Sequence, residues 1–386
     1  MENRLNTSLP IDKLITHQTP FYFYDMQLLR NTLACINRLI ADKPFVIHYA
    51  VKANGNRQIL DEICNAAMGV DLVSGGEIKA TLEAGFAPGD MTFSGVGKAD
   101  WEIKLALHNG IGCFNVESIP ELLNINQLAI EMDTTANIAI RVNPDIDAHT
   151  HRFITTGKAD NKFGIALEQL DQVIKLATSM QHINLRGLHF HIGSQITDMQ
   201  PYRMLCDTVN RLQDEYEQQG VTFQLINVGG GLGVDYDDPD SNPMADFERY
   251  FGVFAQQLKL RPGQKLHFEL GRSIVAQCGS LISRVLYVKQ ARDRRFVILD
   301  AGMTDLMRPA LYQARHRVQN LTATTSEAET YDVVGPVCES SDTFARDCVL
   351  PATQRGDLVA IRSAGAYGES MASTYNMRAL PDTFFA

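Results

Sequence analysis

The sequence lacks any long apolar segment. No run approaches the roughly 18–20 residues that a membrane-spanning helix needs. The N-terminal residues MENRLNTSLPIDKL also lack the hydrophobic core of a signal peptide. Positive charge is scarce, because 35 lysines and arginines face 45 aspartates and glutamates, which gives a formal net charge of −10. We therefore expect a cytoplasmic protein whose main partner is neither a membrane nor a nucleic acid.

Paired cysteines are also missing. The seven cysteines are odd in number and scattered, with no CxxC pair and no zinc-ligand spacing. Reduced thiols in a cytosolic protein are the simplest interpretation. Only Cys338, inside the stretch GPVCESSD, is a candidate for chemistry.

What the chain does contain is a regular alternation of strand-like and helical segments from Phe45 onward. Eight short runs have strand character: VIHYAV, GVDLVS, MTFSG, CFNVES, IAIRVNP, GLHFHIG, LINVGGG and LHFEL. Eight strands with intervening helices over roughly 230 residues predict a (β/α)8 barrel. An open doubly wound sheet is the alternative, and the regularity of the alternation favours the barrel.

The pattern changes after about residue 270. Segments such as CGSLISRVLYVKQ and RRFVILDAG are strand-like, with little helix between them, and predict a second, mostly β domain. The early strand-like FYFYD (21–25) could join it. We expect an α/β fold with the barrel over residues 26–268 and a discontinuous β-rich domain of residues 1–25 and 269–386. The aperiodic stretch 145–164 is long for a loop, and such loops tend to be functional.

Catalytic residues of a (β/α)8 barrel lie at the C-terminal ends of its strands. Here those positions carry mainly polar residues, together with a run of glycines. A lysine at the end of a buried strand costs desolvation free energy unless it is paired or used chemically; a lysine that snorkels to the rim of the sheet is the alternative. The set comprises Lys52, Asp71, Ser74, Ser94, Asn115, Glu117, Arg141, Asn143, His191, Ser194, Gly229, Gly230, Gly231, Glu269 and Arg272.

Two of these strand ends suggest anion and ring binding. The glycines of INVGGGLG follow the seventh predicted strand, where barrels often bind phosphate through backbone N–H groups; a flexible turn is the alternative. HFHIGSQ places His189 and His191 on one face of a strand. A metal pair would need further ligands, and the other strand ends offer a lysine, an arginine and glycines instead. We therefore expect no metal, a histidine packed on an aromatic ligand, and Ser194 near an anion.

The stretch HFELGRS completes this pattern. Glu269 and Arg272 could form a simple salt bridge, but beside a pyridine ring Glu269 would keep the ring nitrogen protonated. A strand-end lysine, a glycine-rich phosphate loop, a stacking histidine and a carboxylate together describe a pyridoxal phosphate site, with Lys52 as the covalent attachment.

Eight motifs then follow one another along the chain: YAVKAN, HTHRFITTGKADNKFG, HFHIGS, NVGGGLG, ELGRS, RPALY, GPVCESSD and AGAYG. In this order and spacing the chain resembles, over nearly its whole length, the fold-type III, alanine-racemase-like pyridoxal phosphate decarboxylases. Within them it is similar to the diaminopimelate decarboxylases.

The resemblance implies a role for each site residue. Lys52 would carry pyridoxal 5'-phosphate, His191 would stack on its ring and Glu269 would pair with its ring nitrogen. Cys338 would act as the proton donor from the partner subunit, so that the active unit is a homodimer with shared active sites. The phosphate would be held by Ser194, Gly229, Gly230 and Gly231, with Tyr367 reaching phosphate or substrate and Asp71 and Arg141 in support.

The substrate follows from the arginines. Diaminopimelate is an amino acid at both ends, so the end that does not react needs a carboxylate binder and an ammonium binder. Arg272 and Arg308 offer forked cations for the carboxylate, Tyr312 a hydroxyl and Glu339 a charge for the ammonium. We expect decarboxylation of meso-2,6-diaminopimelate to L-lysine and CO2, the last step of lysine biosynthesis.

Three alternatives are open. The nearest is a decarboxylase of lysine, ornithine or a carboxylated polyamine. Its substrates lack a distal carboxylate, so Arg272 and Arg308 would be left without an anionic partner, which is costly in a dry pocket. An amino-acid racemase shares the barrel and the lysine, but GPVCESSD and RPALY favour a decarboxylase. A non-catalytic pyridoxal phosphate carrier is a single barrel, which the long segment after the barrel disfavours.

Overall fold

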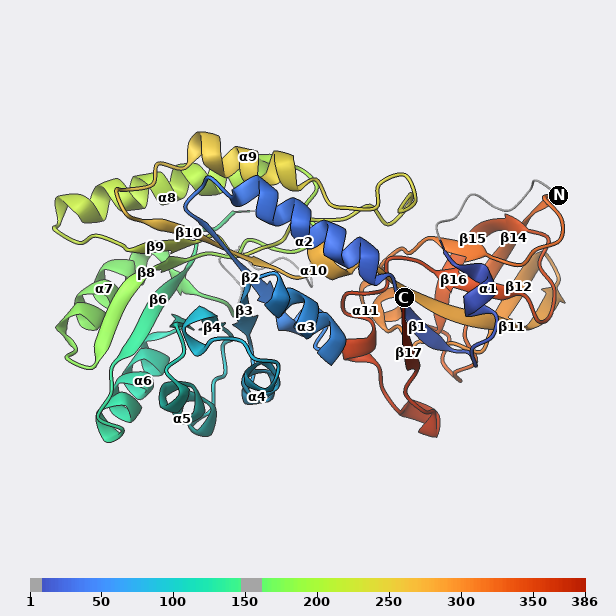
Figure 1. Ribbon diagram of the computed structural model, residues 1–386, viewed down its shortest axis with the longest axis horizontal. Coiled ribbons are helices and arrows are strands. Elements are labelled where there is room, and N and C mark those ends of the chain that lie inside the picture. Colours follow the sequence, from blue (N-terminus) through green and yellow to red (C-terminus); the bar gives the residue numbers. More distant parts are fainter. Residues whose placement is uncertain (1–8, 147–161) are drawn as a thin grey trace. The chain divides into compact units, whose positions relative to one another are not determined.

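The computed structural model describes residues 9–146 and 162–386 (Figure 1). Within these ranges the chain forms two compact units. The barrel unit comprises Leu33–Gly233 and Asp246–Gly271. The β-rich unit comprises the N-terminal residues up to Thr32, the segment Val234–Ala245, and Arg272–Ala386. The domain boundaries at residues 26 and 268 stay a prediction.

The barrel unit is built on a closed sheet of eight parallel strands among the described residues. The sheet runs in the order β5-β4-β3-β2-β10-β9-β8-β6, and β5 pairs with β6 to close it. The two-residue strand β7 (Ile165–Ala166) pairs with the end of β6. The predicted (β/α)8 barrel is therefore confirmed, with each of the eight predicted runs supplying one strand: β2 (Phe45–Ala50), β3 (Gly69–Leu72), β4 (Met91–Phe93), β5 (Cys113–Val116), β6 (Ala136–Asn143), β8 (Ile183–His189), β9 (Leu225–Asn227) and β10 (Lys265–Leu270).

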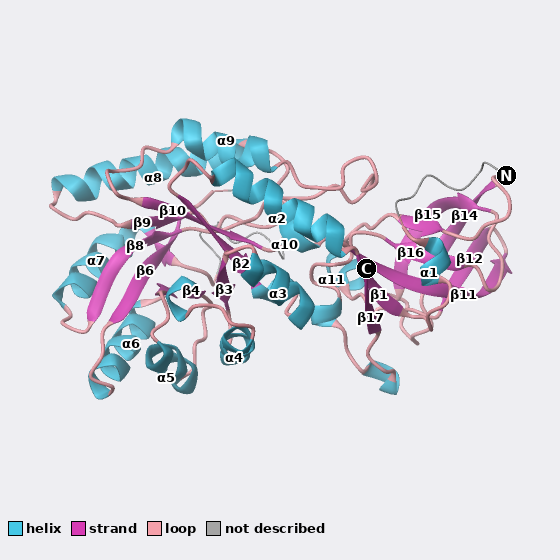
Figure 2. Ribbon diagram, in the orientation of Figure 1, coloured by secondary structure: helices cyan, strands magenta, loops and turns pink. Residues whose placement is uncertain are grey.

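Helices cover the outside of these strands (Figure 2). Several begin at a side chain that caps the helix N-terminus: Asn56 accepts from Gln58 N before α3, and Ser74 from Glu77 N before α4. Ser74, one of the polar strand-end residues, is thus a helix cap. The helices are α2 (Met26–Ile40), α3 (Arg57–Asn65), α4 (Gly75–Glu83), α5 (Asp100–Asn109), α6 (Ile119–Glu131), α7 (Leu170–Ser179), α8 (Gln200–Gln218) and α9 (Phe247–Gln257).

Aromatic side chains fix α8 and α9 against the barrel. Tyr202 of α8 meets Tyr250 of α9 edge to face, with ring centroids 4.9 Å apart. Phe251 and Phe254 of α9 contact Phe268 of β10 at 5.1 and 5.2 Å. Such pairs bury large apolar areas in defined geometry, and they hold β10, the strand that carries Glu269.

The β-rich unit is an eight-stranded sheet within the residues described. Its main order is β13-β16-β11-β12-β14-β15. β1 (Phe21–Tyr24) pairs antiparallel with β11 and parallel with β17, so FYFYD joins the second sheet as predicted. Phe21 and Phe23 pack in the same core cluster as Ile282 of β11. The other strands are β11 (Gly279–Ala291), β12 (Arg294–Leu299), β13 (Val318–Asn320), β14 (Ala328–Val334), β15 (Thr343–Pro351), β16 (Leu358–Ile361) and β17 (Asp382–Phe385), with short helices α1 (Ile11–Leu14), α10 (Arg272–Val275) and α11 (Arg308–Tyr312).

Candidate active site

Lys52 is paired with a buried carboxylate. It lies in a single 3-10 turn (Val51–Ala53) at the end of β2, and its Nζ is 2.9 Å from Asp71 Oδ2 on β3. The Lys52 side chain is 39% exposed, whereas that of Asp71 is fully buried. Asp71 Oδ1 accepts from Ser94 Oγ at 2.6 Å. The buried Asp71 carboxylate thus holds the amine of Lys52, a side chain that is partly exposed to solvent.

Glu269, at the end of β10, lies at the centre of a second group of contacts. Its Oε1 accepts from Asn115 Nδ2 at 2.8 Å and from Asn227 Nδ2 at 2.7 Å. Its Oε2 accepts from His189 Nε2 at 2.9 Å. Because Asn115 Nδ2 also donates to Ser94 Oγ at 2.8 Å, one hydrogen-bonded network runs from Lys52 to Glu269 across the strand ends.

The two carboxylates of this network have opposite pKa shifts. Burial alone would raise the pKa of Glu269, but the charge and hydrogen bond of His189, and then the charge of Lys52, lower it below its ordinary value. Burial raises the pKa of Asp71, the charge of Glu269 adds to the increase, and Lys52 opposes both. Burial therefore affects both carboxylates, but the neighbouring charges reverse its effect on the pKa only at Glu269.

His191 has a neutral imidazole. Its Nδ1 lies 3.2 Å from the Gly230 N–H, which donates to it, so that nitrogen carries no proton. Desolvation lowers the pKa of His191 well below its ordinary value, and Arg141 and Lys52 contribute in the same direction. A neutral ring can lie on an aromatic ligand without the cost of burying a charge. Ser194, three residues further on, is half-buried.

The three glycines are required by close backbone approach. A Cβ on Gly230 would lie 1.9 Å from the Glu269 carbonyl oxygen, and one on Gly231 2.4 Å from that of Gly193. Gly229 has φ +65° and Gly231 φ +103°, which disfavour other residues. The Gly229 N–H donates to Asn227 Oδ1 at 2.9 Å. The cluster is thus a tightly packed turn.

Arg141, at the end of β6, forms a buried ion pair. Its Nη1 lies 2.6 Å from Glu117 Oε1, and the Gly164 N–H donates to Glu117 Oε2 at 2.9 Å. The Arg141 guanidinium also lies over the Phe163 ring, 4.7 Å from its centroid. Most of the stretch 145–164 that we predicted to be a functional loop lies outside the described residues.

The β-rich unit brings the two predicted arginines together. Arg272 Nη1 donates to the hydroxyl of Tyr236 at 2.7 Å, and the Arg308 guanidinium lies 4.9 Å from the centroid of the same tyrosine ring. The Tyr367 ring is 5.0 Å from the Arg272 guanidinium. Both arginines are buried. Burial lowers the pKa of Arg272, but Tyr236, Tyr367 and Tyr312, at the end of α11, raise it above its ordinary value.

Cys338 and Glu339 lie apart from this cluster on an exposed turn between β14 and β15. Glu339 Oε1 accepts from the Tyr375 hydroxyl at 2.8 Å. The buried Asp342 fixes the turn, because its Oδ2 accepts from Val337 N at 2.7 Å and its Oδ1 from Met303 N at the same distance. No described contact within the chain joins Cys338 or Glu339 to the arginines.

Sequence reasoning missed several contributors. Asn227 and His189 hold Glu269, and Tyr236 joins the arginines. Asn115 was among the predicted strand-end residues, and His189 stood near a predicted strand end, so the strand-end rule could have assigned it to the site as well. Asn227 stood two residues before the glycines, inside the predicted strand, and its type alone gave no sign of this role. Tyr236, in an irregular segment, carried no signal.

The barrel site fits pyridoxal phosphate. Glu269 Oε1 accepts two hydrogen bonds and Oε2 one, which leaves lone-pair capacity for a further donor such as a pyridinium N–H. Asn115 Oδ1 and His189 Nδ1 are buried without a partner among the described residues, so the site has polar capacity left for a ligand.

Elsewhere in the described part of the chain, as in the site, no group of three histidine, cysteine, aspartate or glutamate side chains could hold a metal ion. No helix in this part of the chain is long and apolar enough to cross a membrane.

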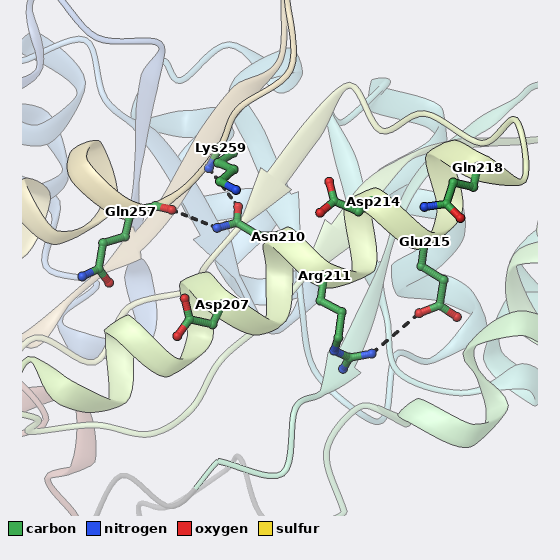
Figure 3. Close-up of a pocket in the computed structure, with 8 residues that line it drawn as sticks. All are labelled: Asp207, Asn210, Arg211, Asp214, Glu215, Gln218, Gln257 and Lys259. Atoms are coloured by element: carbon green, nitrogen blue, oxygen red, sulfur yellow. Dashed lines mark hydrogen bonds and ion pairs between the residues drawn. The ribbon is translucent and has the colours of Figure 1, made fainter.

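The hollow shown in Figure 3 belongs to a different part of the barrel unit. It is lined by charged and amide side chains of α8 together with Gln257 and Lys259. Asn210 connects α8 to the backbone at the end of α9. Its Nδ2 donates to Gln257 O at 2.9 Å, and its Oδ1 accepts from Lys259 N at 2.8 Å. None of the predicted site residues lines it.

Comparison with known proteins places this geometry in a family. The model of the pyridoxal-binding domain of pyridoxal-dependent decarboxylases matches residues 27–276. The chain is 58% identical over 373 residues to a diaminopimelate decarboxylase of Bacteroides thetaiotaomicron, covering 96% of each. It is 42% identical to that of Vibrio cholerae, covering 93% of this chain and 85% of the relative. A crystal structure of the Helicobacter pylori enzyme complexed with L-lysine superposes with a TM-score of 0.91 at 40% identity, covering 97% of this chain and 93% of that one. The chain therefore belongs to the pyridoxal-dependent decarboxylases and, among them, to the diaminopimelate decarboxylases.

Proposed function

We propose that the protein decarboxylates meso-2,6-diaminopimelate to L-lysine and CO2, with pyridoxal 5'-phosphate as cofactor. The observation that carries the choice of substrate is the buried arginine pair around Tyr236. A substrate with a second amino-acid end offers that pair a carboxylate, whereas a diamine-forming substrate does not. The relative from Helicobacter pylori crystallises with L-lysine, the product expected here.

Residues of the barrel unit hold the cofactor. When bound, pyridoxal phosphate supplies an electron sink for the bond that breaks as CO2 leaves. Lys52 attaches it through Nζ, and Asp71 sets the position of that amine. Glu269, kept negative by His189, holds a proton on the ring nitrogen. The neutral His191 packs on the ring, while Ser194 and the Gly229–Gly231 turn lie at the phosphate, supported by Arg141.

Residues of the β-rich unit select the substrate. Arg272 and Arg308 bind the distal carboxylate as forked donors, with Tyr312 adding a hydroxyl and Tyr367 reaching substrate or phosphate. Glu339 binds the distal ammonium group through opposite charge.

Cys338 supplies the proton that replaces the lost carboxyl group. Its exposed turn supports a role in a second copy of the chain, so we propose a homodimer in which Cys338 and Glu339 serve the partner's site. We also propose a cytoplasmic location, with no nucleic acid as partner, in keeping with the net charge of −10.

The test supplies the purified protein and pyridoxal phosphate with meso-diaminopimelate, L-lysine or L-ornithine in separate assays. CO2 release and the chirality of the product amine are followed. L-Lysine formed only from the meso compound supports the proposal. Release from lysine or ornithine would overturn the substrate, and racemisation without CO2 would overturn the reaction.

A variant test addresses Lys52 itself. Lys52→Ala should abolish turnover, and borohydride should no longer fix the cofactor to the chain. Lys104→Ala, on the exposed face of α5, is the matched control and should keep both properties. Near-normal turnover of Lys52→Ala would contradict the assignment.

A further inference from the structure

The arginine pair is held by two acceptors, neither of which is a carboxylate. Tyr236 presents its hydroxyl oxygen to Arg272 Nη1 at 2.7 Å, and His316 presents Nε2 to Arg308 Nη1 at 2.8 Å. The rings of Tyr236 and His316 meet edge to face, 5.0 Å apart at 76°. Tyr236, His316 and both arginines are buried within the β-rich unit. The Tyr236 and His316 rings thus contact each other, and each accepts a hydrogen bond from one of the two guanidinium groups.

Hydrogen-bond chemistry fixes the tautomer of His316. An arginine has no acceptor, so His316 Nε2 must accept from Arg308 and carries no proton. The other ring nitrogen, Nδ1, then donates to the Arg362 carbonyl oxygen at 2.8 Å. Burial lowers the pKa of His316 to about 3, and the charge of Arg308 adds to the decrease. The imidazole is neutral over the whole physiological range.

Further hydrogen bonds and an ion pair hold the backbone around Tyr236 and His316. Arg317 N donates to the Tyr236 carbonyl oxygen at 3.0 Å. Arg362, whose carbonyl orients His316, forms an ion pair with Asp240 at 2.9 Å and donates to Gln319 Oε1 at 2.7 Å. The segment Val234–Ala245 is thereby connected to Arg317 and Arg362, which lie next to β13 and β16.

A hydroxyl or imidazole acceptor can orient a guanidinium without the full negative charge of a carboxylate. Among the described residues, Arg308 forms no ion pair with a carboxylate. Burial lowers the pKa of Arg308, Tyr236 opposes the decrease, and the charge of Arg272 adds to it. Such a buried, uncompensated cation binds an incoming carboxylate more strongly than one already paired. An aspartate or glutamate in the place of Tyr236 or His316 would compete with the substrate.

We propose that Tyr236 and His316 are positioning residues that hold Arg272 and Arg308 at the spacing required to bind the distal carboxylate of the substrate. This inference rests on the proposed function. It makes these two side chains determinants of substrate affinity and selectivity that need not touch the reacting atoms.

The test separates substrate affinity from chemistry. Tyr236→Phe removes the hydroxyl acceptor and keeps the ring. We expect the KM for meso-diaminopimelate to rise about tenfold or more, because a hydrogen bond to a charged group is lost, with kcat within about threefold and the cofactor absorbance unchanged. Tyr331→Phe is the matched control. Its buried ring carries a hydroxyl that contacts Glu329 and Thr353, so its KM should stay at the wild-type value.

Inhibition gives a second readout. L-Lysine retains the distal carboxylate, whereas cadaverine lacks it. Tyr236→Phe should weaken competitive inhibition by L-lysine about tenfold and leave inhibition by cadaverine unchanged. Equal weakening of both, or of neither, would overturn the inference.

A pair of His316 variants keeps the inference testable if Tyr236→Phe fails to fold. Glutamine can accept from Arg308 and donate to the Arg362 carbonyl, whereas leucine can do neither. His316→Gln should therefore keep the KM within about threefold of wild type, and His316→Leu should raise it at least tenfold. Equal KM values in the two variants would overturn the inference. Absence of wild-type turnover of meso-diaminopimelate would instead mark failure of the proposed function.

Discussion

His189 Nε2 donates to Glu269 Oε2 over 2.9 Å, and both side chains are buried at the ends of β8 and β10, two barrel strands with β9 between them. The imidazole thereby orients the carboxylate and favours its charged form. Asn115 and Asn227 hold the other oxygen. The carboxylate is thus held at both oxygens before a ligand arrives, by His189 on one side and by Asn115 and Asn227 on the other.

Glu269→Gln should remove the charge while keeping the size of the side chain. A neutral amide cannot hold a proton on a pyridine nitrogen, so we expect kcat to fall roughly 100-fold or more. The measurement is steady-state turnover with saturating cofactor. Glu248→Gln, on the exposed face of α9, is the control, and similar kcat values in the two variants would contradict the role of Glu269.

Gly230→Ala should destabilise the barrel. The added Cβ would lie 1.9 Å from the Glu269 carbonyl oxygen, so the strand ends must move apart, and overpacking of this kind costs about 1–3 kcal/mol. Gly252→Ala, in α9 with nothing within 4 Å of the new Cβ, should stabilise by about 0.5–1 kcal/mol. Urea unfolding measures both changes, and a Gly230→Ala variant as stable as wild type would disprove the close approach.

Cys338→Ala should slow turnover roughly 100-fold, because the proposed proton donor is lost. The absorbance of the bound cofactor should not change, since the barrel unit is untouched. Cys64→Ala, in α3 of the barrel unit, should behave like wild type. Unchanged turnover of Cys338→Ala would remove this thiol as the acid.

Acid should destabilise the fold through buried histidines. His48 and His267 stack with ring centroids 5.0 Å apart, and His48 Nε2 lies 2.8 Å from His267 Nδ1. Burial lowers the pKa of His267 to about 3, with His48 contributing. Between about pH 6.5 and 3 the unfolded chain therefore binds more protons at this residue than the folded one.

The free energy of unfolding should thus be constant with respect to His267 above about pH 6.5. Below that value it should fall by up to about 1.4 kcal/mol per pH unit for this residue. Urea titrations at pH 7, 6 and 5.5 measure the slope, and His267→Gln should flatten it. An equal slope in wild type and variant would exclude this source of acid sensitivity.

Much of the fold follows from local pattern. The eight apolar runs from VIHYAV to LHFEL became the eight barrel strands, because a strand buried on both faces needs a short, nearly continuous hydrophobic segment. The strand-end rule then placed Lys52, Asp71 and Glu269 at one rim, since parallel strands of a barrel end on the same side. These inferences need only sequence order.

The sequence by itself determined the barrel, the second sheet and the cofactor, because periodicity and motif spacing are properties of the chain. It also predicted which lysine, carboxylate and arginines form the site. Only the tertiary structure decided which neighbours control those groups. Asn227 reaches Glu269 across 42 residues and Tyr236 reaches Arg272 across 36. Such contacts depend on strand register and on the path of an irregular segment, where a shift of one residue turns a side chain away, and no local pattern records them.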